Sequence, residues 1–294
     1  MEYTTKYDFA KYEGTTTLID EPSNFSLSFN FLPKRKSNAI KSIYSFCSYI
    51  DDIVDELENT DENINIKKNR LSFWKQTLHL IYSQPLNKIN HISKFAEVVR
   101  NFNIPQEYLS CLITTCERDL NKNRYATYSE LTDYIYGVAV VVGLMCINIF
   151  GNNNEYTRNY ALNIATALQL TNIIRDIKPD KDRNFIYLPQ EELNNYNYNV
   201  ADLINEKYND NFINLMKFQT QRAKDYFKKA EESLVPPNDR VNMLPARIMG
   251  AIYYDILKKI EKNKYKVFDK KIRISNFRKI IITLKVLIKN LFNR

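Results

Sequence analysis

Apolar residues recur along most of this chain at intervals of three and four positions, which places them on one face of an α-helix. Alternation of apolar and polar residues, the pattern of a strand, is confined to the short segment NFIYLP at 184–189. Residues 1–22 are polar and aperiodic, which predicts a loosely ordered N-terminal arm. Residues 23–294 are predicted to form a single all-α domain, with helices over 36–57, 63–83, 88–101, 105–122, 128–150, 155–177, 200–233, 240–263 and 275–293.

The composition supports a helical globular protein. Hydrophobic residues make up 44% of the chain, and only five of its 294 residues are glycine, which marks turns and unusual backbone angles. Lys and Arg exceed Asp and Glu by 42 to 34, which suits an anionic partner such as nucleic acid, an acidic membrane or a phosphorylated ligand. No compact run of basic residues interleaved with aromatics occurs. Nucleic acid is therefore the weakest of these partners, and we expect none.

The cysteines and the apolar runs bear on metal binding and on location. The four cysteines form no CxxC pair and stand far in sequence from the two histidines, which argues against a zinc site and for a reduced, cytoplasmic protein (Cys47, Cys111, Cys116 and Cys146; His79 and His91). The first residues, MEYTTKYDFAKYEG, lack the apolar core of a secretory signal. The longest apolar run, VAVVVGLMCINIF at 138–150, falls short of the roughly 20 residues needed to cross a bilayer. We interpret it as a buried core helix.

Four carboxylates crowd the end of one predicted helix, in the segment IYSFCSYIDDIVDEL at 43–57. On a helical wheel Asp51 and Asp55 lie beside the apolar stripe, whereas Asp52 and Glu56 turn further towards solvent. Like charges four residues apart cost about 0.2–0.5 kcal/mol, and the helix dipole opposes negative charge at a C-terminus. A bound cation would remove both penalties. A solvated acidic helix end is the alternative.

A second polar face lies in the segment ALQLTNIIRDIKPD. Its amide and carboxylate side chains are spaced by three, four and four residues, which aligns them on one helical face: Gln169, Asn172, Asp176 and Asp180. Oxygen donors without His or Cys suit Mg²⁺, which keeps waters and shares its shell with substrate phosphates. Two such faces predict opposed helices that hold Mg²⁺ around a diphosphate, with unrelated surface acids as the alternative. The predicted metal ligands are Asp51, Asp55, Asn172, Asp176 and Asp180.

Four segments resemble, in order, the squalene/phytoene synthase family: FLPKRKSNAIKSIYSFCSYIDDIVDE, YSELTDYIYGVAVVVGLM, ALQLTNIIRDIKPDKDRNFIYLP and LPARIMGAIYYDILKKIEKNKYKVFDKKIRIS. The sequence is most similar to the bacterial enzymes that make phytoene, dehydrosqualene or presqualene diphosphate. The resemblance implies the isoprenoid synthase fold, a single helical bundle around a central cavity. It also implies Mg²⁺-dependent head-to-head (1'-1) condensation of two identical allylic prenyl diphosphates.

The resemblance further implies roles for individual residues. Two DxxxD motifs, the first with Asp51 and Asp55 and the second with Asp176 and Asp180, bind Mg²⁺ and diphosphate in the family. Substrate contacts are implied for the companions of the second motif and for an upstream acid: Gln169, Asn172, Arg175 and Asp119. The family's YxxxVxxxVG helix lines the prenyl cavity, here with Tyr134, Val138, Val142 and Gly143. Aromatic faces can stabilise carbocations, and the candidates are Phe29, Tyr44 and Tyr134.

Two positions of the first motif helix depart from the family pattern. Ser37 and Ser48 stand where the family has arginines that contact or support phosphate. We hypothesise that Lys41 supplies the missing charge beside Ser48, with Lys36 or Arg35 as alternatives. Ser48 and Lys41 are therefore candidate substrate contacts.

Two other departures lie outside that helix. Ser23 and Asn24 stand in the region where relatives have a serine pair that touches diphosphate. Pro179 lies inside the second motif, where it cannot donate a backbone hydrogen bond and disfavours α geometry at Lys178. The helix is expected to end there, which weakens the predicted spacing of the second motif.

The expected function is condensation of two farnesyl diphosphates to presqualene diphosphate, carried on to squalene or dehydrosqualene. NADPH would be needed only if squalene is the final product; the five glycines cannot form a G-x-G-x-x-G motif, although squalene-forming relatives use NADPH without it. Prenyl chain elongation is disfavoured, because ELENTDEN follows the first motif where those enzymes have an Arg-Arg pair. Two alternatives stay open: phytoene synthesis from two geranylgeranyl diphosphates, and a non-catalytic membrane-associated or assembly protein that keeps the fold.

The C-terminal segment SNFRKIIITLKVLIKNLFNR predicts an amphipathic basic helix, with Arg278, Lys285 and Lys289 on one side of its Ile and Leu residues. Such a helix can dock on an acidic membrane surface, or it can cap the core. We expect a cytoplasmic monomer, and the sequence leaves both peripheral membrane contact and a dimer open.

Overall fold

The computed structural model describes residues 29, 32–55, 60–85, 92–151 and 153–292. Within these ranges the elements are helices, and no strand occurs, which confirms the all-α prediction. The segment NFIYLP contributes only an isolated bridge between Arg124 and Ile186. The predicted arm over 1–22 lies outside the described residues, together with Ser23 and Asn24.

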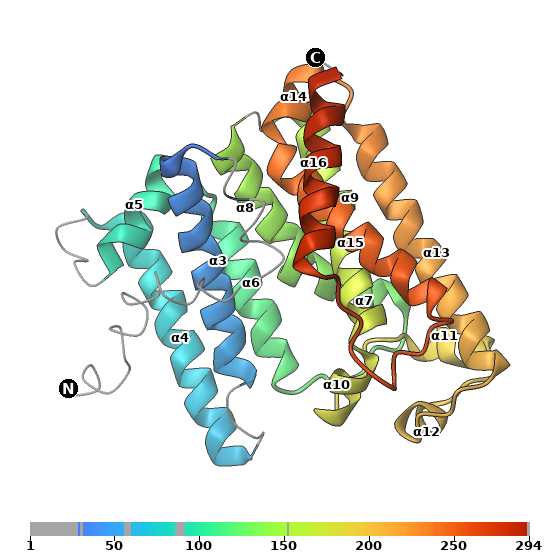
Figure 1. Ribbon diagram of the computed structural model, residues 1–294. Helices are drawn as coiled ribbons and strands as arrows, with labels where there is room; N and C mark the ends of the chain where they lie inside the picture. The colour runs from blue at the N-terminus through green and yellow to red at the C-terminus, as the bar shows by residue number, and fades with distance from the viewer. Residues whose placement is uncertain (1–28, 30–31, 56–59, 86–91, 152, 293–294) are drawn as a thin grey trace.

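The helices form two neighbouring groups (Figure 1). On the left of the view stand α3 (Lys34–Asp55), α4 (Asp61–Ser83), α5 (Ser93–Asn101), α6 (Gln106–Asp119) and α8 (Val141–Phe150). On the right stand α9 (Glu155–Arg175), α13 (Asp210–Ser233), α14 (Pro237–Asn242), α15 (Leu244–Lys262) and α16 (Asn276–Phe292). Shorter elements lie towards the bottom of the view: α7 (Tyr128–Ile135), a π-helix (Tyr136–Val140), α10 (Ile177–Asp182), α11 (Gln190–Asn195) and α12 (Val200–Ile204).

Asparagine caps helices and occupies turns in this chain, which has few glycines. Asn154 and Asn209 cap the N-termini of α9 and α13, each accepting a hydrogen bond from a backbone N–H three residues on. Asn103, Asn184 and Asn197 adopt positive φ values of 49°, 64° and 50°, which asparagine tolerates better than most residues. A chain with five glycines thereby still ends its helices and turns sharply.

The helix predicted over 200–233 is wrong, because two helices occupy that range. α12 ends at Ile204 and α13 begins at Asp210. Between them Glu206 adopts a φ of 52°, and the Asn209 side chain accepts a 2.9 Å hydrogen bond from the N–H of Phe212. This N-cap starts a new helix and breaks the continuous periodicity that the apolar residues show.

The helix predicted over 128–150 is present but carries a π-helical turn at its centre. A side chain at Gly137 could not be accommodated, because its Cβ would lie 1.9 Å from Oγ1 of Thr115 on α6. By length and composition, Tyr128–Phe150 could cross a membrane. It nevertheless packs among α3, α6 and α9 and buries Val140, Val141 and Met145. We therefore keep the interpretation of a core helix.

Helix α9 occupies the middle of the bundle and packs against α8, α13 and α15. On the other side, Phe46 of α3 stacks on Phe95 of α5 at 4.7 Å and meets Trp74 of α4 edge-on at 5.3 Å. These contacts hold α3 on the other side of the bundle, so the first aspartate pair, on α3, faces the end of α9 that leads into the second pair.

Candidate active site

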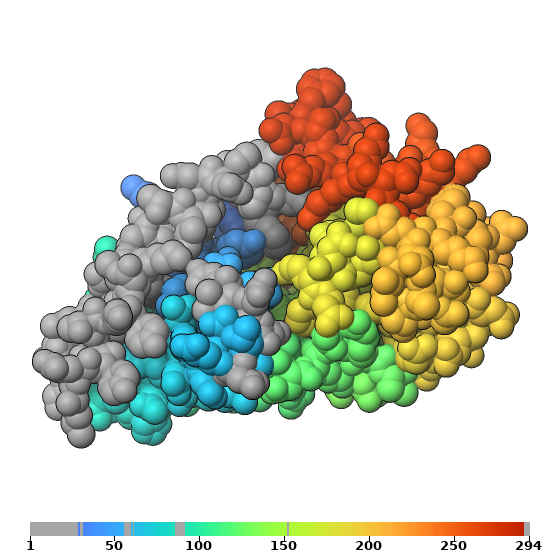
Figure 2. All heavy atoms as spheres, turned by 90° about the horizontal axis from the view of Figure 1, so that it is seen from below, coloured from blue at the N-terminus to red at the C-terminus, as the bar shows by residue number. Residues whose placement is uncertain are grey.

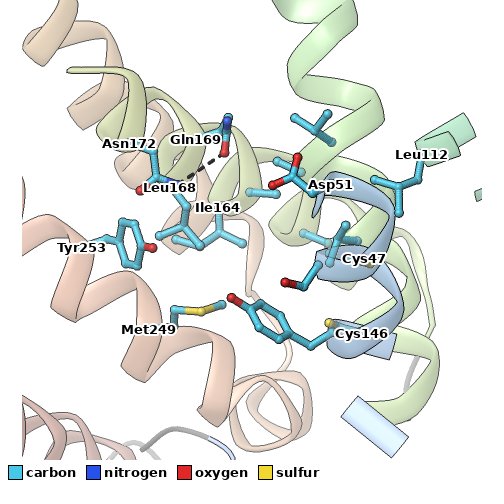
Figure 3. Close-up of a pocket in the computed structure, with 18 of the residues that line it drawn as sticks. Cys47, Asp51, Leu112, Cys146, Ile164, Leu168, Gln169, Asn172, Met249 and Tyr253 are labelled. Atoms are coloured by element: carbon cyan, nitrogen blue, oxygen red, sulfur yellow. Dashed lines mark hydrogen bonds between the residues drawn. The ribbon is translucent and has the colours of Figure 1, made fainter. Parts of the chain in front are cut away.

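A cavity of about 410 Å³ opens between α3 and α9. Figure 2 looks at the molecule from the α10 end and shows a hollow between the blue α3–α4 region and the yellow segment that contains α10. Its walls are mainly apolar and include Ile43, Leu112, Ile164, Leu168 and Met249. Figure 3 shows Asp51 on α3 facing Gln169 and Asn172 on α9 across this space. The cavity is therefore apolar in its depth and polar at one end.

The first acidic face lies where the wheel predicted it. Asp51 and Asp55 both line the cavity at the C-terminal end of α3, whereas Asp52 does not. Tyr44 and Ser48 line the same wall at earlier turns of the helix. Glu56 falls outside the described residues.

The second pair of aspartates, Asp176 and Asp180, keeps its helical spacing although the helix is interrupted between α9 and α10. α9 ends at Arg175, one residue before Asp176, and α10 starts at Ile177 with Pro179 inside it. This helix was predicted over 155–177, so its end was placed two residues too late. The backbone N–H of Asp180 still donates a 3.0 Å hydrogen bond to the carbonyl of Asp176, which keeps the four-residue spacing. Proline is tolerated because it lies in the first turn of the new helix.

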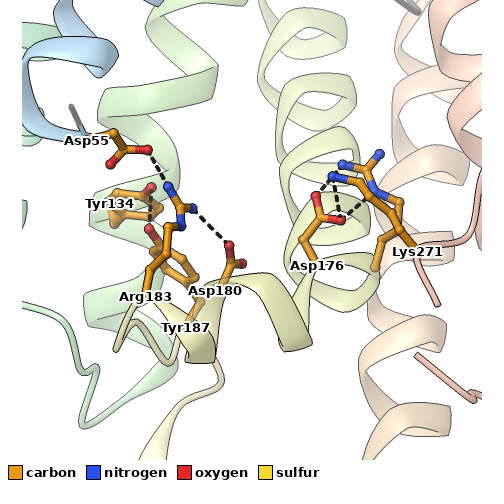
Figure 4. Close-up of polar contacts among 8 residues, drawn as sticks. Asp55, Tyr134, Asp176, Asp180, Arg183, Tyr187 and Lys271 are labelled. Carbon is orange, nitrogen blue, oxygen red and sulfur yellow. Dashed lines mark hydrogen bonds and ion pairs between the residues drawn. The ribbon is translucent and has the colours of Figure 1, made fainter. Parts of the chain in front are cut away.

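Asp176 is held by two cations (Figure 4). Arg175 donates to both of its carboxylate oxygens, one through Nε at 2.9 Å, and the ammonium of Lys271 lies 3.1 Å from Oδ1. Burial alone would raise the pKa of Asp176, but these bonds and charges outweigh it and lower that pKa. Asp176 is therefore an ionised, oriented carboxylate.

Arg183 joins the two acidic faces and was missed by the sequence analysis. Its guanidinium donates to Asp55 on α3 and, at 3.1 Å, to Asp180 on α10 (Figure 4). Burial and the nearby charge of Asp176 raise the pKa of Asp180 to about 6, although Arg183 and Lys271 act in the opposite direction. Arg183 follows the second motif directly, in DKDRNFIYLP, but nothing in the local sequence shows that it, and not the neighbouring lysine, reaches the first motif.

Two further carboxyls at this end of the cavity have strongly raised pKa values. Burial raises the pKa of Asp51 to about 7, with added repulsion from Asp55 and Asp52, even though the side chain is open to the cavity. Burial, together with Asp51 and Asp55, raises the pKa of Asp119 to about 8. The shared cause is negative charge gathered in a poorly solvated space. A cation bound there would be strongly stabilised.

An aromatic cluster lies beside these carboxyls. The ring of Tyr134 stacks on Tyr187 at 5.1 Å, and their hydroxyls are 3.3 Å apart. Tyr187 also stacks on Phe185 at 5.9 Å and on Tyr125 at 5.7 Å. Tyr134 was predicted to face the cavity and does so, whereas Phe185 and Tyr187 were missed although they also line it. Their signal was NFIYLP, whose short alternation indicated a strand rather than a cavity wall.

The remaining predicted substrate contacts mostly line the cavity as well: Phe29, Asp119, Val138, Val142, Gly143, Gln169, Asn172 and Arg175. At Gly143 the backbone of α8 runs close to α9, and a Cβ would lie 3.4 Å from the carbonyl oxygen of Ala161. At the far end Ile40, Phe150 and Tyr160 close the space. Tyr160 precedes Asn172 by twelve residues of α9, about 18 Å of helix.

The substitutes proposed for the missing arginines do not reach the cavity. Lys41 is absent from its lining, as is Ser37, whereas Ser48 is present. Lys36 donates instead to the carbonyl of Phe150 at the end of α8. Arg35 lies over the ring of Phe102, 5.4 Å from its centroid. Lys41 follows the cavity-lining Ile40 but lies on another face of α3, and the other two cations lie in the first turn of that helix.

The residues fit magnesium as an ion shared with a diphosphate. No group of three or more His, Cys, Asp or Glu in the described ranges is placed to hold a metal by itself. Mg²⁺ commonly takes one or two carboxylates and completes its shell with waters and substrate phosphates. Asn172 adds a specific observation, because its Oδ1 is buried without a hydrogen-bond partner among the described residues. Such an oxygen is costly unless a ligand satisfies it.

An all-helical bundle around an apolar cavity, with two aspartate pairs at its mouth, defines the class of helical isoprenoid synthases. The sequence profile of the squalene/phytoene synthase family matches residues 20–278. The chain therefore belongs to the squalene/phytoene synthase family, whose members are prenyltransferases.

Comparisons with known proteins agree with this assignment. The chain is 30% identical over 271 residues to the phytoene synthase of Arthrospira platensis, covering 87% of this chain and 85% of that one. It is 29% identical over 253 residues to the 4,4'-diapophytoene synthase of Staphylococcus haemolyticus, covering 85% and 87%.

Two crystal structures share the fold. A dehydrosqualene synthase has a TM-score of 0.78 at 24% identity, covering 96% of each chain. A squalene synthase from Alicyclobacillus acidocaldarius has a TM-score of 0.74 at 24% identity, covering 87% of this chain and 95% of that one. These two likenesses bear on the fold alone, and they confirm the isoprenoid synthase fold predicted from the sequence.

Proposed function

We propose that the protein joins two farnesyl diphosphates head to head into presqualene diphosphate and converts this to dehydrosqualene or squalene. One observation carries the proposal: aspartate pairs on α3 and on the α9–α10 junction face each other at the mouth of an apolar cavity. Carboxylates suit a Mg²⁺–diphosphate complex, and apolar walls suit prenyl chains.

The charged end of the cavity is suited to removing diphosphate. Asp51, Asp55, Asn172, Asp176 and Asp180 would hold Mg²⁺, which when bound neutralises charge on the leaving diphosphate. Arg175 and Lys271 orient Asp176 from the side. Arg183 sits between the two aspartate pairs and offers its guanidinium to phosphate oxygens.

Carbon–carbon bond formation then requires a cavity that excludes water, and it requires no dedicated general acid or base from the protein. The first diphosphate leaves with the electron pair of its C–O bond, and the double bond of the second substrate attacks the resulting allylic carbon. Loss of one proton closes the cyclopropane ring, and the departed diphosphate can accept that proton. The faces of Tyr134, Phe185 and Tyr187 stabilise positive charge near the aspartates, while the apolar walls keep water out.

Synthesis of phytoene from two geranylgeranyl diphosphates is the second candidate, and the relatives support it equally well. The phytoene synthase of Arthrospira platensis supports it, as the diapophytoene synthase of Staphylococcus haemolyticus supports the first. The shorter substrate is placed first because bulky side chains, Phe150 and Tyr160, close the far end of the cavity. NADPH is required only if squalene is the final product.

The test is turnover by the purified protein. The protein is incubated with Mg²⁺ and either farnesyl or geranylgeranyl diphosphate, with and without NADPH, and products are identified by mass spectrometry. Presqualene diphosphate or dehydrosqualene from farnesyl diphosphate is expected, with none formed in EDTA or by Asp51→Asn. Product from geranylgeranyl diphosphate alone would select the phytoene alternative. No turnover of either substrate would overturn the proposal.

A further inference from the structure

The C-terminal helix α16 is folded onto the protein with its apolar side outward. Its largest exposed side chains are Phe277, Ile280, Leu284 and Ile288, which are 74%, 48%, 52% and 53% exposed. Spacings of three, four and four residues place them on one side of the helix, which we call the outer apolar face. A surface helix ordinarily turns this side to the core.

The opposite side of α16, against the protein, carries polar residues together with the buried Ile282. Lys279, Thr283 and Asn290 are at most 7% exposed, and Asn290 accepts a 2.9 Å hydrogen bond from the buried Arg247 of α15. At the start of the helix, Arg278 makes two hydrogen bonds of 2.9 and 2.8 Å to Asp255 of α15. These bonds fix the rotation of α16 about its axis, so the outer apolar face cannot turn inward without breaking them. Figure 1 shows α16 lying along α15 at the surface.

The charge of the C-terminal segment, and of Lys285 and Lys289 above all, favours an anionic partner. From Lys270 to Arg294 the sequence contains eight Lys or Arg residues and no Asp or Glu. Lys285 and Lys289 are exposed on α16 beside the apolar residues. A second copy of the chain would bring the same lysines against each other in a symmetric contact. An anionic surface that also accepts apolar side chains satisfies both features at once.

We propose that the outer apolar face of α16 docks on an anionic lipid bilayer, with Lys285 and Lys289 at the headgroups. Basic amphipathic helices bind bilayer surfaces by burying their apolar side and attracting anionic lipid. α16 begins five residues after Lys271, which contacts Asp176 at the cavity mouth. This surface is separate from the cavity, so the proposal stands whichever prenyl diphosphate is the substrate.

Vesicle flotation of the full chain tests the proposal. The vesicles are phosphatidylcholine alone or phosphatidylcholine mixed with phosphatidylglycerol. The altered protein is Leu284→Ser with Ile288→Ser. The matched control is Leu80→Ser with Ile204→Ser, whose apolar side chains are 40% and 53% exposed on α4 and α12. Circular dichroism melts confirm that each variant folds, which is expected because every substituted side chain is at a surface.

The wild type and the control should float with the anionic vesicles. The α16 double variant should lose binding by about tenfold or more, because two large side chains no longer reach the bilayer. Lys285→Glu with Lys289→Glu should lose binding to anionic vesicles by a similar factor. Equal flotation of the α16 double variant and the wild type would overturn the proposal. Failure of the wild type to float with anionic vesicles would also overturn it. If the wild type then sediments as a dimer and the α16 double variant as a monomer, the outer apolar face is a contact with a second copy of the chain.

Discussion

Arg183 of the α10–α11 connection hydrogen-bonds both Asp55, at the end of α3, and Asp180, within α10. Residues from two distant parts of the chain therefore meet on one guanidinium at the cavity mouth. This arrangement partly neutralises two carboxylates that would otherwise repel each other, and it keeps the motifs at a working separation. It also offers a fixed cation to a diphosphate.

Replacing Arg183 by alanine should lower kcat/KM by about 10- to 100-fold, because a hydrogen bond to a charged group contributes about 1.5–3 kcal/mol. Arg183→Lys should recover part of the loss, since it keeps the charge without the two-pronged geometry. Steady-state kinetics with the preferred diphosphate measure both. Lys224→Ala, which breaks an ion pair with Glu261 outside the cavity, is the control. Wild-type kinetics in Arg183→Ala would contradict the assigned role.

Asp119 should make the metal-free protein less stable as pH rises. Its pKa is raised from 3.8 to about 8 by burial and by Asp51 and Asp55, so between these values the folded state holds a proton that the unfolded state releases. The free energy of unfolding therefore falls with rising pH over that range. Asp119→Asn carries no such proton, so its stability relative to wild type should increase up to about pH 8 and then level off.

Thermal melts in EDTA at several pH values between about 4.5 and 9 measure this difference. Asp225→Asn, at an exposed site on α13, is the control and should show no such trend. A constant difference between Asp119→Asn and wild type at all pH values would rule out the buried, repelled carboxyl.

Asn172→Leu should separate stability from function. Its Oδ1 is buried without a partner among the described residues, so an apolar replacement of similar shape should leave the melting temperature in EDTA unchanged or raise it. Activity should fall by about 100-fold or more, because a ligand for the Mg²⁺–diphosphate complex is lost. The neighbouring Thr171, whose hydroxyl already donates to the carbonyl of Ala167 at 2.7 Å, gives the control Thr171→Val. Full activity in Asn172→Leu would remove it from the site.

Lys41 and Ser48 should behave differently although both lie on α3. Lys41→Ala should leave KM within about twofold of wild type, because Lys41 does not line the cavity. Ser48→Arg should place a guanidinium one turn from Asp51, lower the pKa of that carboxyl and tighten diphosphate binding several-fold. Substrate affinity, measured by kinetics or calorimetry, checks both. A large rise in KM for Lys41→Ala would restore the hypothesis made from the sequence.

Tyr160 should influence which chain length fits. Tyr160→Ala enlarges the far end of the cavity and should raise the use of geranylgeranyl relative to farnesyl diphosphate by about tenfold. Tyr160→Phe keeps the wall and removes a buried hydroxyl that has no partner within the described residues, so it should gain about 1 kcal/mol of stability with unchanged products. Product ratios by mass spectrometry, together with melting curves, provide the measurement. Identical product ratios in Tyr160→Ala and Tyr160→Phe would exclude a role in length selection.

Several features could be predicted because they depend on local geometry. Asp51 and Asp55 were separated correctly from Asp52, since the 3.6-residue period of the helix decides which side chains share a face. The helix break near Pro179 was expected as well, although it falls three residues earlier, at Asp176. The split between α12 and α13 was missed because the Asn209 cap is a short local signal within a long apolar periodicity.

The sequence by itself determined the helical class, both aspartate motifs and the amphipathic pattern of the C-terminal segment, because the period of a helix is a property of the backbone. Tertiary structure alone decided that Arg183 bridges the motifs, that Lys271 holds Asp176, and that Lys41 lies away from the cavity. It also decided that α16 turns its apolar side outward. A wheel shows which residues share a face, whereas the packing of distant helices selects which face is buried.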